Sequence, residues 1–123
     1  MKVALASDHG GFNLRHVLIE HLKSIAVEFL DLGCSTQASV HYPDYASECA
    51  HTILKKDADI GVLVCGTGLG MCIAANKVNG IRATVCTNAY MARMARAHND
   101  SNILCLGERV VGYGIAVDIV NVF

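Results

Sequence analysis

Apolar residues recur along the chain in two alternating patterns. Short runs that are apolar throughout predict buried strands, and apolar residues spaced three or four positions apart predict amphipathic helices. The predicted strands cover residues 2–7, 27–31, 60–64, 82–86 and 103–106. The predicted helices cover residues 13–23, a segment opening at Pro43, and residues 70–77, 89–97 and 114–122. Each predicted strand is therefore followed by a predicted helix.

Strands that are apolar throughout need cover on both faces, as in the parallel sheets of α/β proteins. The alternation predicts this class: a three-layer α/β sandwich with a five-stranded parallel sheet and helices on both faces, a Rossmann-like arrangement. No linker, internal repeat or low-complexity segment interrupts the pattern, so residues 1–123 are expected to form a single domain. In such sheets ligands bind at the carboxyl ends of the strands, near the switch in strand order.

Three predicted helices have patterns that suggest what they bury. The helix opening at Pro43 has one face made of Ala46, Cys49, Ala50 and Ile53. The helix over residues 89–97 has a stripe of Met91, Met94, Ala95 and His98, with Arg93 and Arg96 on the other side. The final helix is apolar nearly all round, so its surface needs more cover than one face of a sheet provides. We therefore expect this helix to be buried between subunits.

Composition narrows the classes of function. The chain has 123 residues, of which 53% are hydrophobic and 17% are charged, as in a globular domain with a sizeable core. A net charge of −1 argues against a nucleic-acid-binding surface. No apolar run has the length of a membrane span, and the N-terminus lacks the pattern of a signal peptide. We expect a cytoplasmic protein that binds neither nucleic acid nor membrane.

Six cysteines, at positions 34, 49, 65, 72, 86 and 105, lie mostly inside apolar segments. They form no Cys-x-x-Cys pair, and the Cys and His residues lack the spacing of metal ligands, so no metal site is expected. Without an export signal, the thiols are expected to be reduced. Five of them are interpreted as small core residues, and only Cys65 has a functional setting.

That setting is the segment Cys65-Gly66-Thr67-Gly68-Leu69-Gly70, between a predicted strand and a predicted helix. Glycine at every second position lets the backbone turn tightly and expose its N–H groups at a helix N-terminus, where an anion is favoured. A thiol beside such an anion hole is a catalytic arrangement. The alternatives are a plain turn or a nucleotide-phosphate cradle, although neither a Walker A motif nor Gly-x-Gly-x-x-Gly is present.

Polar residues cluster near the ends of the other strands as well. They are Asp8-His9, His41-Tyr42-Pro43-Asp44, His98-Asn99-Asp100 and Gly107-Glu108-Arg109. We expect them to share one rim of the sheet with Cys65, a set that suits proton transfer on a small anionic substrate. The plainer alternatives are that Asp8 caps the first helix, that His98 is a buried core histidine and that Arg109 forms a surface ion pair.

Several longer motifs carry a resemblance to a known family. The chain resembles the sugar-phosphate isomerases that include ribose-5-phosphate isomerase B and the galactose-6-phosphate isomerase subunits. The similarity runs through the whole chain in order. The matching motifs are Ala6-Ser7-Asp8-His9-Gly10-Gly11-Phe12, Tyr42-Pro43-Asp44-Tyr45-Ala46, Cys65-Gly66-Thr67-Gly68-Leu69-Gly70, Ile73-Ala74-Ala75-Asn76-Lys77, Gly80-Ile81-Arg82-Ala83, His98-Asn99-Asp100 and Arg109-Val110-Val111-Gly112.

The resemblance implies an activity and an assembly. It implies interconversion of an aldose phosphate and a ketose phosphate, with a pentose phosphate preferred, and with neither a metal nor a cofactor. It also implies a homodimer or a dimer of dimers with sites built from both subunits, in which His98 and Arg109 would complete the site of the neighbouring chain. Hexose-phosphate isomerisation and a non-catalytic sugar-phosphate-binding module remain as alternatives. The C-terminal extension of the family, which carries phosphate-binding arginines, is not expected here because the sequence ends at Phe123.

The resemblance also implies roles for individual residues. Cys65 would be the base that moves a proton between C2 and C1; some relatives use a glutamate at the position of Met71 instead. Asp8 and His98 would assist ring opening and proton movement on the sugar oxygens. The hydroxyl-orienting residues would be Thr67 and Asn99, and the phosphate ligands His9 and Arg109. The remaining substrate-binding residues would be Tyr42, Gly66, Gly68, Leu69 and Gly70.

Overall fold

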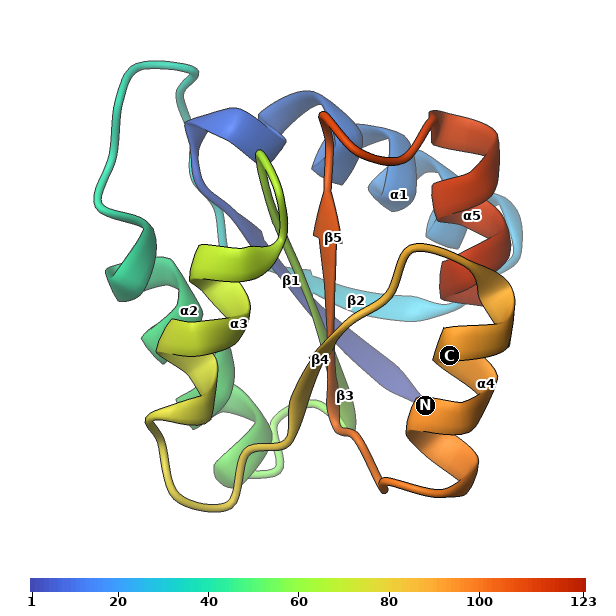
Figure 1. Cartoon of the computed structure of the whole chain (residues 1–123). Helices are drawn as coiled ribbons and strands as arrows, with labels where there is room; N and C mark the ends of the chain where they lie inside the picture. The colour runs from blue at the N-terminus through green and yellow to red at the C-terminus, as the bar shows by residue number, and fades with distance from the viewer.

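Five parallel strands form the central sheet of the computed structural model, which describes residues 1–123 (Figure 1). Their order across the sheet is β2-β1-β3-β5-β4. The strands are β1 (Lys2–Ser7), β2 (Glu28–Asp31), β3 (Ile60–Cys65), β4 (Ala83–Val85) and β5 (Ile103–Gly107). The predicted strands are confirmed, with ends shifted by one residue at most.

Helices cover both faces of the sheet, as predicted. One face is covered by α1 (Phe12–Ser24), α4 (Ala89–Ala97) and α5 (Tyr113–Val122), whose buried residues share a core with the sheet. The other face is covered by α2 (Tyr42–Leu54) and α3 (Leu69–Asn76). The α/β sandwich expected from the pattern of strands and helices is therefore the observed fold.

The sheet has its switch in strand order between β1 and β3. From β1 the chain goes to β2 on one side, and β3 then pairs with the other side of β1, with Ser7 level with Val64. The next neighbour, β5, ends level with β3, because Cys65 pairs with Gly107. The carboxyl ends of β1, β3 and β5 consequently lie together at one edge, the upper edge of the sheet in Figure 1. This is the position where ligands bind in sheets of this kind.

The inner face of α2 is the one predicted, and that of α4 matches the prediction only in part. Ala46, Cys49, Ala50 and Ile53 are all buried in the core under α2 and α3. In α4 the buried residues are Ala92 and Ala95, whereas Met91 and His98 are exposed. The small alanines pack on the sheet and α5, which turns the larger side chains away from the core. Of the predicted stripe Ala95 is buried, and the alternative that His98 is a buried core histidine is wrong.

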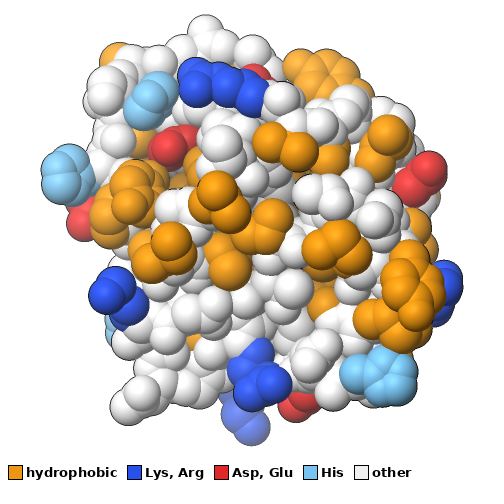
Figure 2. All heavy atoms as spheres, in the orientation of Figure 1, with side chains coloured by type: hydrophobic (Ala, Val, Ile, Leu, Met, Phe, Trp, Pro, Cys, Tyr) orange, Lys and Arg blue, Asp and Glu red, His pale blue; other side chains and the backbone are white.

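The final helix keeps much of its apolar surface exposed in the single chain. It buries Ala116 and Ile119, while the Ile115 side chain is 53% exposed. Figure 2 shows apolar side chains gathered on the face of α3, α4 and α5 that surrounds the edge strand β4. The large exposed side chains of these helices and of the turn before α5 are Leu69, Ile73, Tyr90, Met91, Val110, Tyr113, Ile115 and Val122. None of the helices has the length and hydrophobicity needed to cross a membrane.

Candidate active site

The glycine loop between β3 and α3 wraps around the sulfur of Cys65. Gly68 has a φ of +84°, which L side chains rarely adopt, and this turn brings its N–H back onto the strand end. The Gly68 N–H donates a hydrogen bond to Cys65 Sγ at 3.0 Å. Thr67 Oγ1 accepts from the Leu69 N–H at 3.2 Å, which fixes the start of α3. Cys65 is buried, with 5% of the residue exposed, and one amide of the glycine loop, that of Gly68, contacts its sulfur.

The turn after β1 packs directly on this loop. A Cβ placed on Gly10 would lie 3.0 Å from the backbone nitrogen of Gly66 and 3.3 Å from Asp8 Oδ1. The Asp8 carboxylate therefore lies beside the glycine loop. Its Oδ1 accepts from the Gly10 N–H at 2.8 Å and so caps the 3₁₀ turn His9–Gly11. The capping role considered from the sequence is confirmed, and it leaves Oδ2 free for other chemistry.

The exposed His9 ring is held by the loop before α2. The Val40 N–H donates to His9 Nδ1 at 3.3 Å. With Nδ1 acting as the acceptor, the neutral ring carries its proton on Nε2, which can donate to an anion. Tyr42, at the start of α2, lies on the other side of the glycine loop, because a Cβ on Gly70 would meet its ring at 3.0 Å.

The turn after β5 continues the pairing of β3 and β5 beyond the strand ends. Glu108 N–H donates to the Cys65 carbonyl at 2.9 Å, and Arg109 N–H donates to the Gly66 carbonyl at 3.0 Å. The Arg109 guanidinium lies over Gly66, where a Cβ would be 3.3 Å from Nη1. One chain thus brings together Cys65, Asp8 and Arg109 around the glycine loop.

The contact between β5 and the glycine loop permits a stability prediction. A Cβ on Gly107 would lie 2.6 Å from the backbone carbonyl of Thr67, which cannot move without displacing the loop. Gly107→Ala is expected to lower the free energy of unfolding by about 1–3 kcal/mol, as overpacking does. Urea denaturation measures this loss. Gly114→Ala is the control, since nothing lies within 4 Å of a Cβ there, and a Gly107→Ala variant as stable as this control would contradict the assigned contact.

His98 and Asn99 are not at the edge of the sheet where Cys65 lies. They follow α4, which runs back from the carboxyl end of β4, so they sit at the lower edge in Figure 1. Two hydrogen bonds fix this placement: Arg82 Nε donates to the Asn99 carbonyl at 2.6 Å, and the Gly61 N–H donates to the Asn102 carbonyl at 2.9 Å. Gly61 and Cys65 are separated along β3 by roughly 13 Å at the usual rise of a strand. The expectation that all candidate residues share one rim of the same chain is wrong for His98 and Asn99, because a residue just before a strand lies at its amino end.

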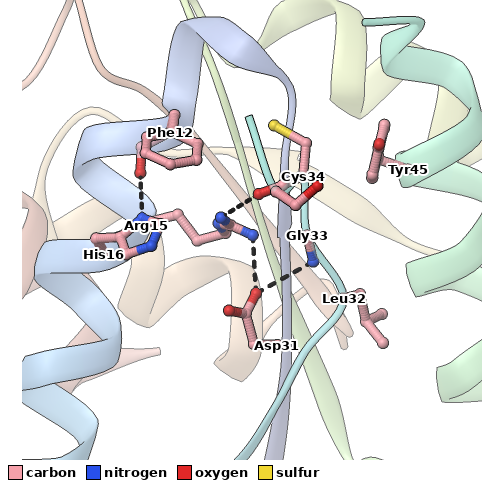
Figure 3. A pocket seen from close by; sticks show the side chains of 9 residues that line it. Phe12, Arg15, His16, Asp31, Leu32, Gly33, Cys34 and Tyr45 are labelled. Atoms are coloured by element: carbon pink, nitrogen blue, oxygen red, sulfur yellow. Dashed lines mark hydrogen bonds and ion pairs between the residues drawn. The ribbon is translucent and has the colours of Figure 1, made fainter. Parts of the chain in front are cut away.

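No cavity of the single chain is lined by Cys65. A polar cavity of about 400 Å³ lies past the end of β2 (Figure 3). It is bordered by the buried Arg15, which forms an ion pair with Asp31 at 2.8 Å and also donates to the Cys34 carbonyl. A second, apolar cavity lies between α1 and α5, and a third borders β4 at Arg82 and Asn99. The single chain therefore has no enclosed cavity at Cys65.

The other five thiols differ from one another. Burial raises the pKa of Cys49 to about 12 and that of Cys86 to about 11. A hydrogen bond with the Cys72 sulfur, followed by burial, raises the pKa of Cys105 well above its ordinary value. Cys72 is only half-buried. Hydrogen bonds with Cys105, with the Val85 backbone and with Asn76, in that order, lower its pKa to about 7 against the opposing effect of burial. The interpretation of the remaining cysteines as core residues holds for Cys34, Cys49, Cys86 and Cys105, but Cys72 departs from it.

Glu108 was expected at this edge from the sequence, but its hydrogen-bond partner was missed. Glu108 Oε1 accepts a hydrogen bond from the Leu14 N–H at 2.6 Å, across 94 positions of the chain. Its place directly before Arg109 is visible in the sequence, but its partner on α1 is not.

With regard to metals, no three His, Cys, Asp or Glu side chains gather in a group that could hold an ion.

Comparison with known proteins agrees with this geometry. The profile of the family described as Ribose/Galactose Isomerase matches residues 3–123. Ribose-5-phosphate isomerase B of Escherichia coli is 46% identical over 120 residues, which cover 98% of this chain and 80% of that protein. The solved structure of ribose-5-phosphate isomerase B from Clostridium thermocellum aligns with a TM-score of 0.98 at 53% identity, covering 99% of this chain and 82% of the other. The corresponding structure from Thermotoga maritima gives a TM-score of 0.98 at 48% identity, covering 99% of this chain and 84% of the other. The chain belongs to the Ribose/Galactose Isomerase family.

Proposed function

We propose that the chain is an aldose–ketose isomerase that interconverts ribose 5-phosphate and ribulose 5-phosphate, with Cys65 as the base. The observation that carries this proposal is the 3.0 Å hydrogen bond from the Gly68 N–H to Cys65 Sγ within the glycine loop. It places a proton-accepting sulfur in a loop at the N-terminus of α3, a setting suited to a developing oxyanion. The relatives named ribose-5-phosphate isomerase B support the choice of substrate.

The reaction needs one carbon-bound proton to move. The Cys65 thiolate takes the proton from C2 of the open-chain aldose, and the released electron pair forms the C1–C2 double bond while O1 takes the negative charge. The proton then returns to C1 and O2 becomes the carbonyl oxygen, which gives the ketose. We place the enediolate oxygens at the backbone amides of residues 66–70, of which the Gly68 and Leu69 N–H groups are bonded to Cys65 Sγ and Thr67 Oγ1 before substrate binds. Losing one such oxyanion donor typically costs about 2.7–4 kcal/mol of barrier.

The other candidate residues handle the oxygens and the phosphate. The free Oδ2 of Asp8 and the His98 ring move protons during ring opening and between O1 and O2. Thr67 and Asn99 orient sugar hydroxyls, and Tyr42 closes the side of the site next to Gly70. His9 Nε2 and the Arg109 guanidinium bind the phosphate, since a planar guanidinium matches its oxygens.

A second copy of the chain completes the site in this proposal. His98 and Asn99 are too far from Cys65 within one chain, and the exposed apolar side chains of α3, α4 and α5 surround an unpaired strand edge. Burying such a surface stabilises an assembly by roughly 25 cal/mol per Å². We place the function in a homodimer or a dimer of dimers in the cytoplasm, each site using Cys65 of one chain and His98 of the other.

Incubation with ribose 5-phosphate tests the proposed function directly. The expected result is formation of ribulose 5-phosphate, which is monitored by its absorbance or by NMR. A parallel panel of allose 6-phosphate and galactose 6-phosphate tests for hexose-phosphate isomerisation, an alternative favoured by the family's description. Binding of these sugars without turnover of any would overturn the proposal in favour of a non-catalytic binding module.

Because Cys65 and the amides supply the proposed chemistry, no divalent ion is required. Dialysis against excess chelator is expected to leave kcat and KM for ribose 5-phosphate unchanged. The control is the same protein dialysed without chelator and then supplied with Mg²⁺, Mn²⁺ or Zn²⁺ in turn. Activity that is lost in chelator and restored by one of these ions would contradict the metal-free mechanism.

A further inference from the structure

The carboxylate of Glu108 links α1 to the turn after β5. Its hydrogen bond with the Leu14 N–H is short, at 2.6 Å, and the group is half-buried. The first turn of α1 has no acidic residue, and its N-cap, Gly11, offers no side chain. Glu108 therefore supplies, from a distant part of the chain, an acceptor for one of the N–H groups that the helix N-terminus leaves unpaired.

The backbone of the same residue is fixed to the glycine loop. Glu108 N–H bonds to the Cys65 carbonyl, and the next residue, Arg109, bonds to the Gly66 carbonyl. The Arg109 side chain is exposed and has no ion-pair partner within the chain. The orientation of the guanidinium therefore depends on the position of the turn after β5, which is bonded to the glycine loop on one side and to α1 on the other.

On its other side Glu108 holds the segment that carries His9. The 3₁₀ turn His9–Gly11 runs directly into α1, and Asp8 caps it through the Gly10 N–H. A shift of the α1 N-terminus would therefore move Asp8 and His9 as well. Two proposed phosphate ligands, His9 and Arg109, are thus joined through one side-chain hydrogen bond in addition to the contacts of the glycine loop.

We propose that Glu108 is a positioning residue, which sets the spacing of Arg109 and His9 for a sugar phosphate by holding the turn after β5 to the N-terminus of α1. This inference rests on the proposed function, because it concerns the phosphate end of the same site. The acceptor oxygen is the essential feature, and the negative charge is not. On electrostatic grounds alone, a carboxylate near a phosphate would weaken binding.

Loss of the positioning hydrogen bond raises KM, whereas loss of the negative charge alone lowers it, so substitutions of Glu108 distinguish the two effects. Glu108→Ala removes the acceptor, and its KM for ribose 5-phosphate is expected to rise about tenfold with kcat little changed, as for the loss of one hydrogen bond. Glu108→Gln keeps an acceptor oxygen at the same reach and is expected to restore the KM. Glu108→Asp keeps the charge but is one methylene shorter, so its KM is expected to resemble that of the alanine variant.

Asp59→Ala is the matched control. Its carboxylate also accepts from a distant backbone N–H, that of Lys2 at 2.7 Å, but at the opposite edge of the sheet. The KM of this variant is expected to stay at the wild-type value. Should Glu108→Ala fail to fold, the comparison of Glu108→Gln with Glu108→Asp still decides the question.

Two outcomes would overturn the inference while the isomerase function stands. In one, the alanine and glutamine variants both lower KM, as the charge alone predicts. In the other, every Glu108 variant keeps the wild-type KM. If the wild-type chain does not turn over ribose 5-phosphate, the proposed function fails. The Kd for inorganic phosphate, measured by calorimetry on each Glu108 variant, then tests the positioning role separately. The same order of Kd values among the variants is expected, and equal values would count against the positioning role.

Discussion

Replacement of Cys65 by alanine is expected to abolish isomerisation while substrate binding is retained. General acid–base groups typically contribute about 10²–10⁴-fold to a rate, and a loss in this range is expected in kcat for ribose 5-phosphate. The methyl group of alanine leaves the strand end and the amides of the glycine loop intact, so the calorimetric Kd for the sugar phosphate is expected to change little. In the Cys65→Ala variant, exchange of the C2 proton with solvent, monitored by NMR, is expected to stop as well.

Cys72→Ala is the matched control for this experiment. Its thiol lies seven positions further along the chain, on α3, and its pKa is lowered to about 7, so Cys72 is itself a candidate base near neutral pH. The mechanism gives it no part, and near-normal kcat is expected. A Cys65→Ala variant that retains near-normal kcat would show that another group is the base. Equal losses of binding and turnover would instead make Cys65 a structural residue.

The fold was predictable because each signal in the sequence is local. A buried parallel strand needs an unbroken apolar run, and its helix needs apolar residues at helical spacing, so both are readable without knowing what they contact. The inner face of α4 was predicted only in part, because Ala92, which lies off the predicted stripe, is buried together with Ala95, which lies on it. Hydrophobic patterning favours large side chains such as Met91, whereas close approach of two helices needs small ones.

The candidate site was predictable only in part for a similar reason. The glycine loop and the residues directly after β1 and β5 can be placed from the rule that strand ends meet at one edge. His98 was placed wrongly because it precedes β5, and a residue before a parallel strand lies at the opposite edge. The bond from Leu14 to Glu108 spans 94 positions, and no local pattern records such a contact. The burial of Arg15 beside Asp31 also depends on tertiary packing, and the sequence around a charged residue in a helix does not indicate it.

The separation of His98 from Cys65 leads to the prediction that two inactive variants restore activity to each other. In a two-fold symmetric dimer whose sites combine Cys65 of one chain with His98 of the other, Cys65→Ala and His98→Ala homodimers each have two defective sites. A mixed dimer has one site with both substitutions and one with neither. Light scattering is expected to find no monomer at working concentration, and a monomer there would remove the basis of this prediction.

Equal amounts of the two variants, exchanged by mild denaturation and refolding, give mixed dimers as half of the population. Since each mixed dimer has one intact site of two, the recovered kcat is expected to be about a quarter of the wild-type value. The matched control mixes Cys65→Ala with Asp8→Ala, whose residues lie at the same edge of one chain, so no mixed dimer has an intact site and no activity is expected. Subunit exchange is verified by mass spectrometry of tagged chains. If exchange is complete and the first mixture stays inactive, His98 does not complete the site of a neighbouring chain, and its distance from Cys65 then excludes it from the reaction.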